Sequence, residues 1–324
     1  MYSRRKFGWM ALSGASLALM PKFGARVFAG GIESTVRGVK IGLITGSLNP
    51  LPEAPGKDPI DRIIEQCLQL GAANVELVSV FAPGQPQVVN GGRFGHPPAP
   101  GAMTSDYQKT RQALREWRVA LPLDRFREVR RKFDAAGLNL FSYVMTITND
   151  MTDAEIEAIF RQMQALGVPM FTTNQTRVSE GPRIVPFSEK YNIKAAWHPH
   201  AQVQDPNEIA TPESIEKVLA MSKSFVVNLD IGHFTAGNND SVAFIKKHHE
   251  RITHLHIKDR RRNDGPNVQL GTGDTPIKEA ASLIRQNRWP IMLILEREYR
   301  DAPGTPVEQT KWQLDYLKGL LETT

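Results

Sequence analysis

Short apolar runs recur through the chain and alternate with segments of helical periodicity. Eight of these runs have the length and apolar content of strands that are buried on both faces. They span residues 39–45, 73–80, 138–146, 168–174, 193–200, 224–233, 252–259 and 291–298. Parallel strands need long crossovers, and the segments between these runs have the pattern of helices. The chain is therefore predicted to form a parallel α/β sheet.

The intervening segments carry ordinary helix start and stop signals. Thr152 precedes a helical pattern with Glu155 three residues on, and Gly71 and Gly137 end two others. The predicted helices span 59–71, 121–136, 152–166, 176–191, 211–222, 240–250, 276–288 and 307–321. No Gly-x-Gly-x-x-Gly follows the first strand, which argues against a dinucleotide-binding sheet. Eight strand–helix units without a linker predict one domain, a (β/α)8 TIM barrel over residues 30–324.

The connection after the second predicted strand is unusually long. Residues 81–117 separate that strand from the next predicted helix, and their centre is rich in glycine and proline. Connections of this kind leave the carboxyl end of a barrel, where active sites lie. The segment is predicted either to cover the site or to be a surface excursion.

The first 29 residues differ from the rest of the chain. Arg4 and Arg5 follow Ser3, a short apolar stretch with glycine and serine comes next, and small residues precede Ala29. This segment resembles a twin-arginine export signal, which implies the twin-arginine export machinery as a partner and a periplasmic or otherwise exported location. An N-terminal anchor or amphipathic helix is the alternative, although the apolar stretch is short for a membrane span.

Charge and cysteine content narrow the classes of function. The formal net charge is +6, but residues 1–29 hold five of the basic residues and no acid, which leaves 35 basic against 34 acidic residues. A nearly neutral body gives no support for binding nucleic acid. Cys67 is the sole cysteine, so an intramolecular disulfide is excluded.

Histidines and carboxylates gather at the ends of the last four predicted strands. They are His198, His200, Asp230, His233, His254, His256, Glu296 and Glu298. Adjacent strand ends converge on one bowl in a closed barrel, and residues two apart share a face of their strand. Mixed imidazole and carboxylate ligands suit Mn²⁺, Zn²⁺, Fe²⁺ or Co²⁺, and Mg²⁺ is also compatible. The sequence therefore predicts a site for one divalent metal ion.

Three motifs in this half of the chain resemble those of the xylose-isomerase-like barrels, a family of sugar phosphate isomerases and epimerases that includes ketose 3-epimerases and inosose dehydratases. The motifs are "NLDIGH", "RITHLHIKDR" followed by "LGTGD", and "LILEREY". The resemblance covers residues 38–320 in layout. It implies a metal held by Asp230, His256 and Glu296 together with a carboxylate on the fifth strand.

The chain departs from this family on the fifth strand, where "KAAWHPH" places His198 and His200 instead of glutamate. We expect His198 as the fourth metal ligand, with His200 as the alternative. Glu296 and a histidine not bound to metal are the expected catalytic bases, because neutral imidazole is well matched to neutral pH. In the epimerases, the resemblance implies, the replaced glutamate is one of two opposed bases, so its loss puts two-base epimerisation in doubt.

Substrate-binding residues are also implied. His233 and Arg262 fall where the family has substrate-binding groups, and Lys258 lies in its HxKD pattern. Glu76, in the second strand, points toward the same bowl by position, and Glu298 shares a strand face with Glu296. A small-molecule carbohydrate is the expected partner, and homo-oligomer formation is left open.

These features predict a divalent-metal-dependent carbohydrate isomerase or epimerase that works through an enediolate on a sugar or keto-sugar. One alternative is a lyase or hydratase acting by β-elimination on 3-keto-glycosides, and another is a non-catalytic periplasmic sugar-binding barrel. The superfamily also includes endonucleases with three zinc ions that act at abasic DNA. Those endonucleases need further histidines on the second and third strands. This chain has "NVELVSV" and "FSYVMT" there, without histidine, which argues against a DNA-processing enzyme.

Overall fold

The computed structural model describes residues 32, 34–51, 55–92, 96–99, 101–299 and 302–323. The predicted export signal, residues 1–29, lies outside these ranges. Ile32–Thr324 form one compact unit. Within the described ranges, no helix combines the length and apolar character required to span a bilayer.

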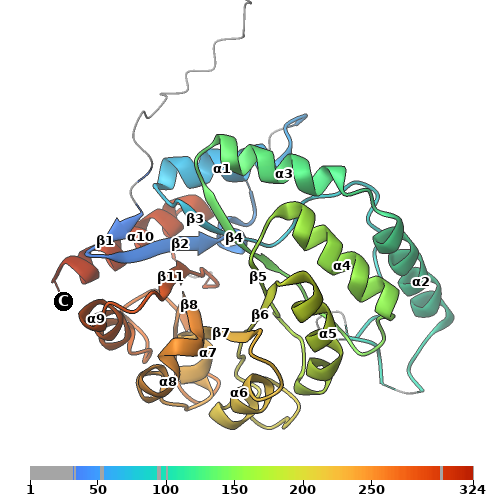
Figure 1. Ribbon diagram of the computed structural model, residues 1–324. Helices are drawn as coiled ribbons and strands as arrows, with labels where there is room; N and C mark the ends of the chain where they lie inside the picture. Colours follow the sequence, from blue (N-terminus) through green and yellow to red (C-terminus); the bar gives the residue numbers. More distant parts are fainter. Residues whose placement is uncertain are drawn as a thin grey trace, which may run out of the picture. The chain divides into compact units, whose positions relative to one another are not determined.

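Eight parallel strands in the described part of the chain close into a barrel (Figure 1). They are β2 (Val39–Ile44), β3 (Asn74–Leu77), β4 (Asn139–Val144), β5 (Met170–Thr172), β6 (Lys194–Trp197), β7 (Phe225–Asp230), β8 (Ile252–Ile257) and β11 (Met292–Leu295). Each pairs with its neighbours in chain order, and β2 closes the barrel by pairing with both β3 and β11. The predicted (β/α)8 barrel is confirmed, and every strand falls within its predicted range.

Three short strands lie outside this cylinder. β1 (Thr35–Val36) pairs with β2 in antiparallel orientation. β9 (Asp259–Arg260) and β10 (Asn267–Val268) form a small antiparallel hairpin directly after β8. This hairpin projects from the carboxyl end of the barrel and so contributes residues to the mouth.

Helices surround the strands (Figure 1). The outer ring consists of α1 (Pro59–Leu70), α3 (Asp124–Ala135), α4 (Asp153–Leu166), α5 (Gly181–Tyr191), α6 (Pro212–Leu219), α8 (Ser241–His248), α9 (Ile277–Asn287) and α10 (Pro306–Thr323). The caps read from the sequence are present, since Thr152 Oγ1 accepts from Glu155 N and Gly71 ends α1 at φ 65°. Large apolar side chains such as Phe160, Phe171 and Trp197 are fully buried.

Short helical turns occupy several connections. They are the 3₁₀ turns η1 (Thr45–Leu48), η3 (Val178–Glu180) and η4 (His249–Arg251), and the helix α7 (Ile231–Ala236). α7 begins directly after β7, with Asp230 as its N-cap residue. As a result His233, which was predicted at the end of a strand, lies in α7.

The long connection after β3 contains a helix that the sequence pattern did not predict. α2 (Ser105–Ala120) fills its second half, and Thr104 Oγ1 caps this helix by accepting from Tyr107 N at 3.1 Å. α2 packs beside α4 (Figure 1). Its contact face carries arginines that reach the buried Glu155 of α4, and such a face lacks the apolar periodicity by which helices are recognised.

Candidate metal centre

The four side chains predicted as metal ligands meet at the carboxyl end of the barrel. Asp230 ends β7, His256 lies in β8, and His198 and Glu296 directly follow β6 and β11. One ligand atom from each of the four residues lies within 4.8 Å of the others. His198 Nε2 is 3.1 Å from His256 Nδ1 and 3.4 Å from Asp230 Oδ2, and His256 Nδ1 is 2.9 Å from Glu296 Oε2.

The donor atoms of this group fit a divalent cation. Asp230 Oδ2 is fully buried and accepts no hydrogen bond within the described residues, although Lys258 Nζ lies 3.0 Å away. Burial opposes ionisation of Asp230, but Lys258 and the neighbouring histidines outweigh it and hold the pKa of this carboxyl well below its usual range. A buried, ionised carboxylate beside two imidazoles and a second carboxylate is the donor set that Mn²⁺, Zn²⁺, Fe²⁺ and Co²⁺ accept.

Glu76, which was expected to point into the barrel mouth, lies beneath His256 in the barrel interior. Its Oε2 is 2.5 Å from His256 Nε2, and its Oε1 accepts from Ser142 Oγ at 3.0 Å and from Thr172 Oγ1. Asn228 Nδ2 lies 3.0 Å from the same imidazole nitrogen. All these side chains are buried inside the barrel. Glu76 therefore orients His256, with Nδ1 toward the other candidate ligands.

Lys258 is surrounded by acidic groups. Its Nζ lies 2.8 Å from Glu296 Oε2, 2.6 Å from Glu298 Oε2 and 3.0 Å from His233 Nε2. Burial alone would lower the pKa of Lys258, but the carboxylates of Asp230, Glu296 and Glu298 raise it above its usual value. Lys258 is thus an ammonium group at neutral pH. Glu298 is 41% exposed, at the outer side of this cluster.

His200 lies next to the candidate ligands without joining them. Its ring is 4.8 Å from those of both His198 and His233, measured between centroids. Burial, with the charges of His198 and Lys258, lowers the pKa of His200 well below its usual value, so the ring is neutral at neutral pH. Of the two histidines left open by the sequence, the structure places His198 against the other ligands and His200 beside them.

The predicted substrate contact Arg262 lies apart from this cluster. It is exposed, and its backbone N donates to Asp274 Oδ2 at 3.0 Å. Arg260 takes the inner position instead, because its buried side chain places Nη1 2.8 Å from His233 Nδ1. The alternation of His256, Lys258 and Arg260 along one strand face is a signal that could have identified Arg260 from the sequence.

Asp259 points away from the metal centre. Its carboxylate accepts from the backbone N–H groups of Gly271 and Gly273, each at 2.8 Å, and of Thr275 at 3.1 Å. A Cβ on Gly273 would lie 2.0 Å from Asp259 Oδ1, so this position needs glycine. The "GTGD" turn therefore binds a side chain of its own protein and holds the β9–β10 hairpin in place.

Gln175 and His96 complete the surroundings of His200 and were not predicted. Gln175 Nε2 lies 2.6 Å from His200 Nε2, and His96 Nε2 lies 2.7 Å from the Gln175 backbone oxygen. His96 comes from the long connection after β3, so that connection contacts a residue that lies beside His200. No spacing in the sequence linked His96 to the other histidines.

Curated relatives match part of the chain. An inosose dehydratase from Lactiplantibacillus plantarum is 25% identical over 151 residues, which is 41% of this chain and 49% of that protein. An inosose dehydratase from Mesomycoplasma hyopneumoniae is 28% identical over 155 residues, or 42% of this chain and 50% of the relative. The chain thus spans about half the length of the curated relatives it matches.

Solved structures match most of the length of this chain. The probable 3-DHS dehydratase from Bacillus anthracis gives a TM-score of 0.57 at 13% identity, covering 86% of this chain and 98% of that one. A 3-keto-D-glucoside 4-epimerase from E. coli gives a TM-score of 0.57 at 12% identity, covering 87% and 99%. At these identities the likeness establishes the fold alone.

A family model described as the xylose isomerase-like TIM barrel matches residues 64–320. This range contains all four candidate metal ligands and seven of the eight barrel strands seen in the described residues. The chain therefore belongs to the xylose isomerase-like TIM barrel family.

Proposed function

We propose that this protein is a divalent-metal-dependent carbohydrate lyase, which removes the proton beside the carbonyl group of a keto-sugar and expels a β-substituent. The observation that carries the proposal is the 2.8 Å distance between Lys258 Nζ and Glu296 Oε2. A proton donor and a proton acceptor lie side by side, as removal of a proton and a leaving group from one face of a ring requires.

The ionisation of the two groups matches these roles. Burial would raise the pKa of Glu296, but Lys258 and His256 lower it well below its usual value, so Glu296 is a carboxylate. Lys258 is an ammonium group for the reason given above. His198, Asp230, His256 and Glu296 would hold the ion, which when bound supplies Lewis-acid stabilisation of the negative charge that develops on the substrate oxygen.

Glu296 and Lys258 together account for every proton transfer of the elimination. Glu296 accepts the proton from the carbon beside the carbonyl, and the electrons of that C–H bond form a carbon–carbon double bond. The bond from the β-carbon to its oxygen breaks, and Lys258 donates a proton to the departing oxygen. Lys258 then recovers a proton from Glu296, which is within hydrogen-bonding distance. Burial and the charge of Lys258 keep the pKa values of His200 and His233 low, so these two rings beside the pair are uncharged at neutral pH.

A carbohydrate isomerase or epimerase is the second candidate. The observation that favours it is the position of His198 and His200 after β6, across the centre from Glu296, where a neutral imidazole can accept a proton from the face of the substrate opposite to the one that Glu296 serves. The curated relatives are named dehydratases, which supports elimination.

Proton exchange in D₂O tests both candidates. Manganese-loaded full-length protein is incubated with a 3-keto-glucoside and with a keto-inositol, and deuterium incorporation and the ultraviolet absorbance of a conjugated enone are followed. Enone formation is expected, whereas deuterium incorporation with an isomeric product would indicate the second candidate. Binding without exchange on any keto-sugar would leave the non-catalytic sugar-binding barrel.

Export through the twin-arginine machinery is proposed from the sequence of residues 1–29. Replacing Arg4 and Arg5 by lysine should abolish recovery of the protein from the periplasmic fraction of a host with that machinery, while a Lys22→Gln variant should be exported normally. Equal export of both variants would refute a twin-arginine signal.

A further inference from the structure

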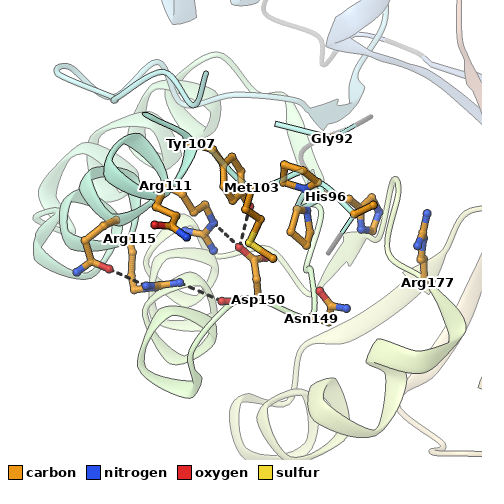
Figure 2. Close-up of a pocket in the computed structure, with 14 residues that line it drawn as sticks. Gly92, His96, Met103, Tyr107, Arg111, Arg115, Asn149, Asp150 and Arg177 are labelled. Atoms are coloured by element: carbon orange, nitrogen blue, oxygen red, sulfur yellow. Dashed lines mark hydrogen bonds and ion pairs between the residues drawn. The ribbon is translucent and has the colours of Figure 1, made fainter. Parts of the chain in front are cut away.

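The half of the barrel mouth opposite the metal centre encloses space that the centre does not use. A cavity of about 660 Å³ is lined by residues at the carboxyl ends of β3, β4 and β5, including Val78, Thr146 and Asn174. A second cavity of about 1010 Å³ lies between the long β3–α2 connection, α2 and the β4–α4 connection (Figure 2). Gly92 and Arg111 line both cavities, so the two adjoin.

Hydrogen bonds link the outer cavity to the metal centre. His96 lines this cavity, as Figure 2 shows, and its Nε2 lies 2.7 Å from the backbone oxygen of Gln175. The side chain of Gln175 in turn contacts His200 at 2.6 Å. His96, Gln175 and His200 are all buried. The inner cavity lies at the ends of β3, β4 and β5 and the candidate ligands at the ends of β6, β7, β8 and β11, so both open on one barrel mouth, and a molecule that extends across this mouth from the ligands meets the inner cavity and then the outer one.

The lining favours an uncharged polar ring. Within the described ranges, the side-chain amides of Gln108, Asn149 and Asn174 have no hydrogen-bond partner, so they are available to hydroxyl groups. The guanidinium group of Arg111 is already bound to Asp150 at 2.7 Å and to Glu155 at 2.9 Å. Met103 adds an apolar face to the same cavity. Free amides beside paired charges suit hydroxyls more than a phosphate or carboxylate.

The size of this space exceeds what one sugar ring needs. Pockets for ligands of drug size typically have about 300–1,000 Å³, and the outer cavity alone reaches the top of that range. We infer that the two adjoining cavities bind the second ring of a glycoside, so that the substrate is a glycoside and not a free monosaccharide. This inference rests on the proposed function for its reacting sugar, but its test does not require turnover.

Calorimetric titration of the manganese-loaded full-length protein with two inert probes tests the inference. The probes are cellobiose and methyl β-D-glucopyranoside, which differ in the presence of a second sugar ring. Cellobiose is expected to bind about tenfold more tightly, because the hydroxyls of its second ring meet the free amides of the cavities. Equal affinities, or no binding of either probe, would overturn the inference.

Two neighbouring positions on α2 provide a matched pair of variants. Gln108 and Lys109 are both exposed, but only Gln108 lines the outer cavity. A Gln108→Trp variant should lose the preference for cellobiose, whereas Lys109→Trp should retain it. A preference that survives in Gln108→Trp also overturns the inference. Preference without proton exchange would refute the proposed lyase alone, and exchange without preference would refute the subsite alone.

Discussion

Glu76 Oε2 lies 2.5 Å from Nε2 of His256, below the four candidate metal ligands. The contact engages one imidazole nitrogen and leaves Nδ1 facing Glu296 and His198. A carboxylate in this position fixes the orientation of a metal-binding histidine and increases its basicity. A carboxylate buried in the barrel interior thus acts on the candidate ligands through His256.

Replacing Glu76 by glutamine should weaken metal binding by about 10–100-fold, because the amide lacks the charge that polarises the imidazole. Equilibrium dialysis against Mn²⁺ measures this affinity. A Glu65→Gln variant, at an exposed position of α1, is the control and should bind normally. Unchanged affinity in the Glu76 variant would contradict the positioning role.

Metal affinity should rise with pH. Burial alone would lower the pKa of His256, but the carboxylates of Glu296 and Glu76 outweigh burial and raise it to about 10. A cation that binds Nδ1 must displace this proton, so affinity should increase about tenfold per pH unit while pH stays below that value. Titration with Mn²⁺ at pH 6, 7 and 8 in a weakly coordinating buffer measures the slope. A flat profile would show that His256 binds no metal.

Replacing Lys258 by methionine should separate the two halves of the proposed reaction. The proton acceptor Glu296 remains, so deuterium exchange should continue, whereas enone formation should fall by about 10²–10⁴-fold because the leaving oxygen has lost its proton donor. Lys190→Met, at an exposed position of α5, should leave both rates unchanged. Equal loss of exchange and elimination would argue against Lys258 as the acid.

Gly232 should tolerate no side chain, because an added Cβ would lie 2.3 Å from Lys258 Cγ and 2.9 Å from its backbone oxygen. Gly232→Ala is expected to destabilise the protein by about 1–3 kcal/mol and to displace the Lys258 ammonium. In contrast, Gly319 of α10 has nothing within 4 Å of such a Cβ, and Gly319→Ala should stabilise by about 0.5–1 kcal/mol. Urea unfolding of the two variants provides the comparison.

Asp58 should contribute stability that depends on pH. Hydrogen bonds from Arg125, and from Lys132 at 2.7 Å, lower its pKa below the usual range and outweigh the opposing effect of burial. A lowered pKa stabilises the fold above the unfolded-state value of about 3.9, and this contribution is lost as pH falls toward the folded-state value. Asp58→Asn should therefore cost about 1 kcal/mol at pH 7, since the pair is partly solvated, and less at pH 3. A constant difference across this range would refute the linkage.

The barrel could be predicted because its strands are short, largely apolar and buried on both faces, and because its helices have ordinary caps. The strand ends predicted a candidate metal site, and the family resemblance singled out Asp230, His256 and Glu296, with His198 in place of the expected glutamate. The position of Arg262 shows where such a resemblance stops. Arg262 was expected from the family pattern, six residues after His256, but the β9–β10 hairpin turns that residue outward and brings Arg260 in.

Other features depend on contacts that no local pattern reveals. Glu76 meets His256 across the interior of the barrel, a pairing between residues 180 positions apart. Arg111, Arg115 and Arg118 hold α2 to Glu155. Because this contact face is polar, α2 lacks the hydrophobic periodicity by which a helix is predicted from sequence. His96 reaches Gln175 from a connection whose composition predicts only the absence of regular structure.

The β3–α2 connection is fixed at both ends. It begins at a barrel strand, and the ion pairs of α2 with Glu155 attach its other end to the outer helix layer. Substitutions between these points leave untouched the strands that carry the candidate metal ligands. Under the proposed function, the reacting groups and the groups that bind the second ring therefore lie in separate stretches of the chain. A library of β3–α2 connections grafted onto one unchanged barrel should then vary the bound glycoside while the candidate metal ligands stay the same.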